Sequence, residues 1–218
     1  MIICGKILPF ALEPSMHCLL IHGQNRTPHS MRWLGLRLRR RGYGVQYFGY
    51  NVQSETFEQI CARLVATLTE SAQPYAIVAH SLGGILARAA LPQLATPLPI
   101  HLVMLGPPNH SPVLARLFKD NPVYIRVTGD CGQQLANSMF YQRLPKPLVP
   151  TTIIAGTEGP RGRWSPFGLA INDGVVSVAE TSLGAAYPLL LVPNIHTFLM
   201  NSPRVLDIID TILREADG

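Results

Sequence analysis

The sequence of 218 residues has little charge. Asp, Glu, Lys and Arg together make up 14% of it, whereas about a quarter is ordinary for a globular chain. Because 47% of the residues are apolar, few charged or polar side chains are available to cover the surface of the folded protein. Two interpretations of this composition stay open. The apolar residues fill one sizeable core, which a chain of this length can form, or some of them stay exposed for a greasy substrate.

Long hydrophobic runs are also missing. No stretch of 18 apolar residues occurs, so the sequence predicts no membrane-spanning segment. The first segment, Met1–Ser15, contains one lysine and an apolar run that Pro9 and Pro14 interrupt, which does not make a signal peptide. No repeat or low-complexity tract divides the rest. We therefore expect a single domain over residues 1–218, with residues 1–15 as an extension to which the sequence assigns no role.

Cysteine is scarce, and its spacing excludes the usual cysteine-based sites. The cysteines form no CxxC pair and have no metal-ligand spacing, and the histidines have no such spacing either, so no metal site is expected. Buried reduced thiols are then the expectation, which favours a reducing compartment and hence the cytoplasm. The four cysteines are Cys4, Cys18, Cys61 and Cys131.

The net charge of +5 is modest and has a local explanation. Part of it comes from Arg37 and the run Arg39–Arg41, just before Gly42, where basic side chains suit the negative end of a predicted helix. No aromatic or glycine-rich basic stretch accompanies them, so no nucleic-acid partner is expected. Peripheral contact with an anionic lipid surface stays open, and the sequence does not indicate an oligomeric state.

Short apolar runs alternate with amphipathic stretches along the chain. The apolar runs are continuous, as in strands that are buried on both faces of a parallel sheet. The alternation predicts an α/β fold with a mostly parallel, doubly wound central sheet and helices on both faces. The predicted strands are His17–Ile21, Val45–Tyr50, Tyr75–His80, Ile100–Leu105, Thr151–Ala155 and Leu189–Val192, and the predicted helices lie near His29–Arg41, Glu55–Ser71, Leu82–Ala90, Ser111–Lys119 and Pro203–Glu215.

Two long stretches are predicted to be irregular. Pro107–Pro150 contains seven prolines around short apolar pieces, and Gly156–Asn172 is rich in glycine and proline. Both would leave from the carboxyl ends of strands, where α/β sheets bind ligands. Long connections in a compact domain are usually functional. We expect them to form pocket walls, and residues 107–150 could equally form a moving lid.

The most informative pattern is Ala79-His80-Ser81-Leu82-Gly83-Gly84, between a predicted strand and a predicted helix. A serine on such a sharp turn is the nucleophile elbow of a hydrolase. The turn holds the backbone of Ser81 in a strained region, so the residues two before and two after it must be small. Ala79 and Gly83 meet this requirement. We therefore expect the hydroxyl of Ser81 to stand above the sheet as a nucleophile.

A serine hydroxyl reacts only where a base and an oxyanion site converge on it. The backbone N–H of Gln24, after the His22-Gly23 strand end, and that of Leu82 are the expected oxyanion donors. His196 follows the last predicted strand and precedes the last helix, where the base belongs. His22 and His80 are expected to be structural, through packing or hydrogen bonds.

Three residues are candidates for the acid that orients the base. Asp173 lies in Asn172-Asp173-Gly174, after a late strand, on a turn that the glycine permits. Glu158 lies just past the same strand, and Asp130 lies within the proline-rich stretch. Asp173 is favoured, because it follows a late strand on a tight turn that can reach the histidine, and the order Ser81, Asp173, His196 is the one typical of strand–elbow–helix hydrolases. Glu158 and Asp130 remain alternatives.

These motifs together resemble the α/β-hydrolase superfamily, and more narrowly the small bacterial lipase and esterase group that carries Ala-His-Ser-x-Gly-Gly. The resemblance runs from about His17 to the last helix. It also includes Leu105-Gly106-Pro107-Pro108-Asn109 and His196-Thr197-Phe198-Leu199. It departs from the group in Ala79, which replaces the usual glycine, and in His110-Ser111-Pro112, at one pocket wall.

The resemblance implies hydrolysis of carboxylic esters through an acyl-enzyme, without a cofactor. A serine hydrolase that acts on a lipid or short acyl ester is therefore the first hypothesis. A thioesterase or an acyltransferase would use the same machinery. A binding protein built on the same fold is the alternative from another class, and it would need neither His196 nor Asp173.

Overall fold

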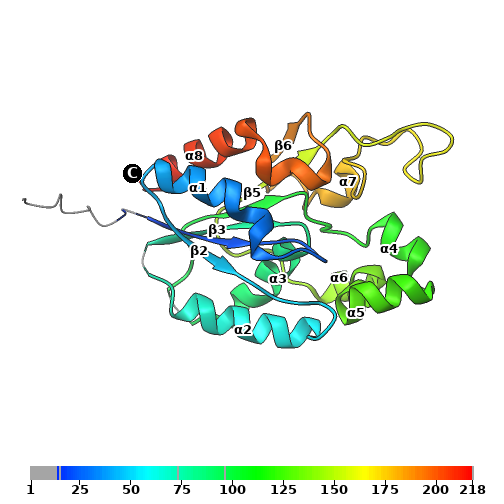
Figure 1. The fold of residues 1–218 in the computed structure, drawn as a ribbon, viewed down its shortest axis with the longest axis horizontal. Helices are drawn as coiled ribbons and strands as arrows, with labels where there is room; N and C mark the ends of the chain where they lie inside the picture. The colour runs from blue at the N-terminus through cyan, green and yellow to red at the C-terminus, as the bar shows by residue number, and fades with distance from the viewer. Residues whose placement is uncertain (1–13, 15, 73, 96, 218) are drawn as a thin grey trace, which may run out of the picture.

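A single parallel sheet forms the centre of the molecule (Figure 1). The computed structural model describes residue 14 and residues 16–72, 74–95 and 97–217. Six strands within these ranges follow the order β2-β1-β3-β4-β5-β6, and every neighbouring pair is parallel. The predicted α/β class is confirmed. The strands are β1 (His17–Ile21), β2 (Gly44–Phe48), β3 (Tyr75–His80), β4 (Leu102–Leu105), β5 (Thr151–Gly156) and β6 (Leu189–Val192).

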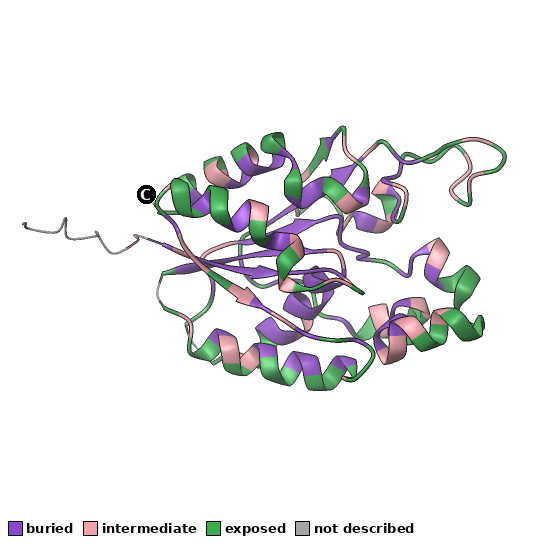
Figure 2. Cartoon of the chain, in the orientation of Figure 1, coloured by how far each residue is buried: buried purple, intermediate pink, exposed green. Residues whose placement is uncertain are grey.

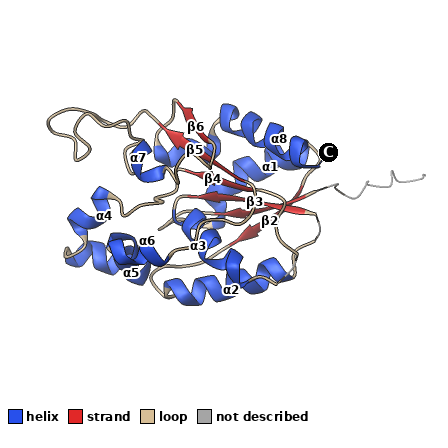
Figure 3. Cartoon of the chain, turned by 180° about the vertical axis from the view of Figure 1, so that it is seen from behind, coloured by secondary structure: helices blue, strands red, loops and turns tan. Residues whose placement is uncertain are grey.

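Helices cover both faces of this sheet (Figures 1 and 3). On one face lie α1 (Arg32–Arg40) and α8 (Pro203–Asp217), and on the other lie α2 (Phe57–Thr69) and α3 (Leu82–Ala90). Successive side chains of a strand point to opposite faces, so the sheet supplies two cores. Figure 2 shows the inner strands β1, β3, β4 and β5 buried between exposed outer helix surfaces. Burial on both sides explains why these inner strands are continuous apolar runs.

Local capping fixes where two of the predicted helices begin. The side chain of Thr56 accepts the backbone N–H of Gln59, whose own side chain accepts the N–H of Thr56. This capping box starts α2 at Phe57, two residues later than predicted. The last helix begins as predicted, with Pro203 in its first turn after Ser202.

The expectation that residues 107–150 are irregular is wrong for much of the segment. It contains α4 (Val113–Phe118), within the helix predicted near Ser111–Lys119, and two helices that were not predicted, α5 (Pro122–Ala136) and α6 (Ser138–Arg143). Pro122 occupies the first turn of α5, where proline has no hydrogen bond to lose, and the side chain of Asn121 caps that turn. Proline content alone therefore underestimated helix here. Gly129, with φ of 55°, interrupts α5.

The second predicted irregular stretch does lack helix and strand between residues 157 and 171. It projects from the molecule as the yellow loop in Figure 1. Trp164 and Leu169 on this loop are each 86% exposed. The remaining elements are the short helix α7 (Val178–Thr181) and three 3-10 helices, η1 (Pro28–Met31), η2 (Leu91–Gln93) and η3 (His196–Asn201).

No helix in the described part of the chain combines the length and the apolar character needed to cross a bilayer.

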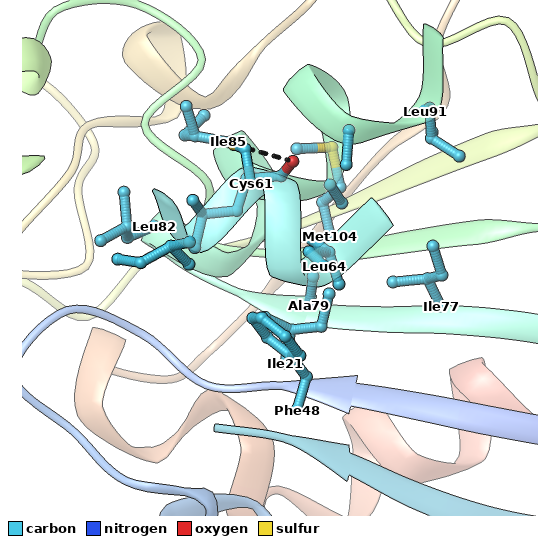
Figure 4. Close-up of a cluster of buried hydrophobic side chains, with 14 of the residues drawn as sticks. Ile21, Phe48, Cys61, Leu64, Ile77, Ala79, Leu82, Ile85, Leu91 and Met104 are labelled. Atoms are coloured by element: carbon cyan, nitrogen blue, oxygen red, sulfur yellow. Dashed lines mark hydrogen bonds between the residues drawn. The ribbon is translucent and has the colours of Figure 1, made fainter. Parts of the chain in front are cut away.

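Three of the cysteines are buried thiols, as predicted. Cys18, Cys61 and Cys131 are free, and burial raises the pKa of each to about 12. In Figure 4, the thiol of Cys61 approaches the carbonyl oxygen of Leu86 in the core beside α3. Cys4 and, except for Pro14, the segment Met1–Ser15 lie outside the described residues.

Candidate active site

Ser81 stands on a strained turn between β3 and α3. Its φ of 53° and ψ of −122° lie outside the ordinary regions for an L-residue. The turn is fixed from behind, because the N–H of Ser81 donates to the carbonyl oxygen of Leu105 at 2.8 Å. The next turn of the chain is crowded, since a Cβ on Gly83 would lie 2.6 Å from the carbonyl oxygen of His22. Figure 4 shows how Leu82 and Ile85 anchor α3 in the core below the turn.

The loop after β1 passes directly beside Ser81. A Cβ on Gly23 would lie 3.1 Å from the Cβ of Ser81, so only glycine lets the chain come this close. Gln24 follows, and its side-chain amide donates to the carbonyl oxygen of Thr128 at 3.5 Å. The N–H of Leu82 belongs to the first turn of α3, which has no partner within the helix. No hydrogen bond within the described ranges uses the backbone N–H of Gln24.

Asp173 and His196 form a buried hydrogen-bonded pair. Asp173 Oδ2 lies 2.7 Å from His196 Nδ1, and the N–H of His196 donates to the carbonyl oxygen of Asp173 at 2.9 Å. Asp173 Oδ1 accepts the N–H groups of Val175 and Val176 at 2.9 and 2.8 Å. Three donors therefore hold a carboxyl group that is only 2% exposed, which a buried carboxylate requires.

A tight turn presents Asp173 to the histidine. The side-chain oxygen of Asn172 accepts the N–H of Gly174 at 2.8 Å, and Gly174 has a φ of 97°, which glycine adopts without strain. The turn lies beyond β5 and His196 lies beyond β6. Because β5 and β6 are parallel neighbours, both residues reach the same edge of the sheet.

The two rival acids lie elsewhere. Glu158 is exposed, and its carboxylate makes no hydrogen bond or ion pair with any described residue. Asp130 instead accepts the N–H of Phe57 at 2.8 Å and the side-chain amide of Gln134 at 3.4 Å. Asp173 is thus the one of the three candidates whose carboxyl group contacts His196 in the described structure.

Ser81 and His196 border one cavity of about 390 Å³. No hydrogen bond joins the hydroxyl of Ser81 to the ring of His196 in the described structure, and such contacts often tighten only when substrate binds. The walls are largely apolar and come from α4, α5 and the residues that follow Asp173. They comprise Pro108, Pro112, Leu114, Ala115, Phe118, Tyr124, Val127, Thr128, Leu135, Val175, Val176 and Thr197, with Gln24, Asn25 and Arg26 at one side.

His22 and His80 are buried supports, as expected. The ring of His80 lies 4.7 Å from that of His196, and its Nε2 bonds to the carbonyl oxygen of His196 at 3.1 Å. Burial, followed by the nearby His196, lowers the pKa of His80 well below its usual value. His22 stacks on Tyr50 and accepts its N–H at 3.3 Å, and burial lowers the pKa of His22. Both rings are therefore neutral supports near neutral pH.

Gly106 is a site residue to which the sequence assigned no role. A Cβ there would lie 3.0 Å from His196 Nδ1 and 3.1 Å from Asp173 Oδ2, and its φ is 55°. It follows β4 and leaves room for the pair. Its place in Leu105-Gly106-Pro107, just after an apolar run, was the signal available in the sequence. The described residues hold no group of three His, Cys, Asp or Glu side chains that could bind a metal.

The fold is similar to solved structures of hydrolases at low sequence identity. The mature lipase BlEst2 of Bacillus licheniformis is 20% identical, with 90% of each chain covered and a TM-score of 0.70. The metagenomic carboxyl esterase MGS0156 is 15% identical over 94% of this chain and 76% of its own, with a TM-score of 0.72. The NocB thioesterase domain of the Nocardicin cluster is 17% identical over 94% of this chain and 95% of its own, with a TM-score of 0.59.

Comparisons with protein families and with curated proteins found no match. The similarity to solved structures, at this level of identity, is one of fold, and it shows that this chain has the fold of the α/β-hydrolases.

Proposed function

We propose that this protein is a serine hydrolase that cleaves carboxylic esters, of a lipid or of a short acyl chain, through an acyl-enzyme. One observation carries the proposal: Ser81 and His196 border the same apolar cavity, and His196 is held from behind by Asp173 at 2.7 Å. A binding protein would have no need for a buried carboxylate and imidazole beside a strained serine.

In the proposed reaction, His196 removes the proton of Ser81 as its hydroxyl oxygen attacks the ester carbonyl carbon. The carbonyl oxygen becomes an oxyanion, which the N–H groups of Gln24 and Leu82 bind. Each such donor contributes about 3 kcal/mol to lowering the barrier. His196 then returns the proton to the leaving alcohol. In the second step His196 deprotonates a water molecule that attacks the acyl-enzyme, and it returns this proton to the oxygen of Ser81 as the acid leaves.

The residues around Ser81 and His196 support these proposed roles. Asp173 stabilises the imidazolium that forms on His196 and fixes its Nδ1–H tautomer. His80, directly behind His196, adds no positive charge of its own, because burial keeps it neutral. The apolar walls contributed by α4 and α5 favour an acyl chain in the cavity. We infer that residues 107–150 act here as a wall.

A fluorophosphonate probe tests the nucleophile directly, because it labels only activated serines. The native protein should be labelled and Ser81→Ala should not, while Ser54→Ala, at an exposed serine, should be labelled as the native protein is. No labelling of the native protein would remove the proposal in favour of a binding protein, and equal labelling of native protein and Ser81→Ala would remove Ser81 as the nucleophile.

Chain-length series then define the substrate. p-Nitrophenyl esters of increasing acyl length should be hydrolysed, with Ser81→Ala as the blank. Matched acyl thioesters form the second arm, because a thioesterase uses the same residues. Labelled protein that turns over thioesters but no ester would assign it to that class instead.

A further inference from the structure

Arg26 differs from every other arginine of the chain. Most arginines are exposed, and the three that are partly or fully buried are Arg26, Arg41 and Arg88. Arg41 forms ion pairs with Asp207 and Asp210. Arg88 is held by carbonyl oxygens and by the side chain of Asn109. The guanidinium of Arg26 has no hydrogen bond or ion pair with any described residue.

Arg26 also lines both the apolar cavity and two hollows whose walls are more polar. It borders the cavity that contains Ser81 and His196. It borders a second hollow, of about 240 Å³, whose side chains include Asn51 and Gln53, and a third, of about 400 Å³, that reaches Ser30. Asn25 and Thr27 line both of these hollows together with Arg26, so hydrogen-bonding side chains and the guanidinium border the same spaces.

The two acids that lie two residues along the chain from the lining residues Gln53 and Thr128 already have partners. Glu55, two residues after Gln53, forms an ion pair with Arg63 at 2.8 Å and accepts the N–H of Asn51. Asp130, which follows the wall residue Thr128, is bound to the N–H of Phe57. The N–H groups of a guanidinium without a protein partner are free to donate to an anion. An anionic ligand would therefore complete the surroundings of Arg26.

We propose that Arg26 binds a phosphate-type group on the alcohol part of the substrate, so that the substrate class is an anionic amphiphilic ester. The guanidinium presents paired N–H donors that match phosphate oxygens. Asn25 and Thr27 offer further donors for the remaining oxygens. The acyl chain would occupy the apolar cavity, and the polar alcohol part of the ester would then occupy the hollows around Arg26. The ester part of this inference rests on the proposed function.

Binding of uncleavable amphiphiles tests the site without relying on turnover. Dodecyl phosphate and the neutral dodecyl glucoside, each below its micelle concentration, are titrated into Ser81→Ala protein by calorimetry. Dodecyl phosphate should bind more tightly. Arg26→Gln should lower the ratio of the two affinities by roughly 10- to 100-fold, as for hydrogen bonds to charged groups. Arg26→Lys keeps the positive charge but loses the paired N–H donors of the guanidinium. Its ratio of affinities should therefore lie between that of the protein with Arg26 and that of Arg26→Gln.

The matched control is Arg126→Gln, which removes an exposed arginine of α5 outside the three hollows. It should change the ratio by less than about twofold. An unchanged ratio in Arg26→Gln, or an equal loss in Arg126→Gln, would overturn the inference, the latter by showing that overall charge attracts the anion. Inorganic phosphate is the third ligand. If it binds as tightly as dodecyl phosphate, the alkyl chain contributes nothing to affinity, and the proposal of an amphiphilic substrate is overturned.

Different results would refute the proposed hydrolase activity and the proposed anion site. Absent fluorophosphonate labelling would remove the hydrolase but leave an anion site that depends on Arg26. Labelling and ester hydrolysis with an unchanged binding ratio in Arg26→Gln would keep the hydrolase and remove the anion site.

Discussion

Asp173 Oδ2 lies 2.7 Å from His196 Nδ1, and a second hydrogen bond, from the His196 N–H to the Asp173 carbonyl oxygen, ties the two backbones together. The pair is anchored at both main chain and side chain, so the ring of His196 has one orientation. Its Nδ1 is committed to the carboxylate, which leaves Nε2 as the nitrogen that can serve as a base.

We expect Asp173→Asn to lower kcat for p-nitrophenyl ester hydrolysis by about 10⁴-fold, because the amide favours the wrong tautomer of His196 and does not stabilise its cation. Initial rates at saturating ester measure the effect. Glu158→Gln is the matched control, at an exposed acid after the same strand, and should keep its rate. A loss of less than about tenfold in Asp173→Asn, with a larger one in Glu158→Gln, would transfer the role to Glu158.

Gly83 and Gly84 give a matched pair in the first turn of α3. A Cβ on Gly83 would meet the backbone carbonyl oxygens of His22 and Ile21 at 2.6 and 2.9 Å, whereas one on Gly84 would meet the terminal methyl of Met104 at 2.7 Å. A methionine methyl can move and a strand backbone cannot. Gly83→Ala should therefore lower the free energy of unfolding by about 1–3 kcal/mol or more.

Gly84→Ala should cost less than Gly83→Ala, because repacking of Met104 and the gain in helix propensity offset the strain. Urea unfolding monitored by circular dichroism compares the two variants. Equal destabilisation would show that packing around α3, rather than the approach of the β1 backbone, sets the requirement for glycine.

Stability should decrease in mild acid. Burial lowers the pKa of His101, whose Nε2 lies 3.0 Å from Thr152 Oγ1, and burial also lowers the pKa of His22 and His80. Below a pH of about 6.5 the unfolded chain takes up protons that these rings cannot hold in the folded protein. The unfolded state then binds more protons, so the free energy of unfolding decreases as pH falls.

The contribution of His101 can be isolated. His101→Asn should make the loss of unfolding free energy between about pH 7.5 and pH 5.5 smaller. Thr152→Val removes the same hydrogen bond but keeps the titrating ring, so it should lower stability at both pH values and leave the loss as large as in the native protein. An identical loss in His101→Asn would contradict the assignment to this ring.

Much of the fold was predictable because its signals are local. Strands β1 and β3 appear where continuous apolar runs predicted them, since both of their faces are covered. Strand β6 also appears where predicted, although it lies at the sheet edge and Leu190 and Leu191 are exposed. The turn at Ser81 was recognisable from small residues at fixed spacing. Helix α5 was missed because its proline suggested a break. Proline breaks a helix in its interior but fits the first turn, and the capped position of Pro122 decides which applies.

The sequence by itself determined most of the strands, the strained serine and the histidine after the last strand, because each depends on neighbouring residues alone. The order in which the strands pair joins segments far apart in the chain and was decided by the tertiary structure. Only the tertiary structure decided which carboxyl group meets His196. Asp173, Glu158 and Asp130 all follow late enough in the chain, and their separation depends on how the turns beyond β5 and β6 pack. It also decided that Arg26 has no ion pair with any described residue, and that Asp130 binds the N–H of Phe57 on a distant segment instead.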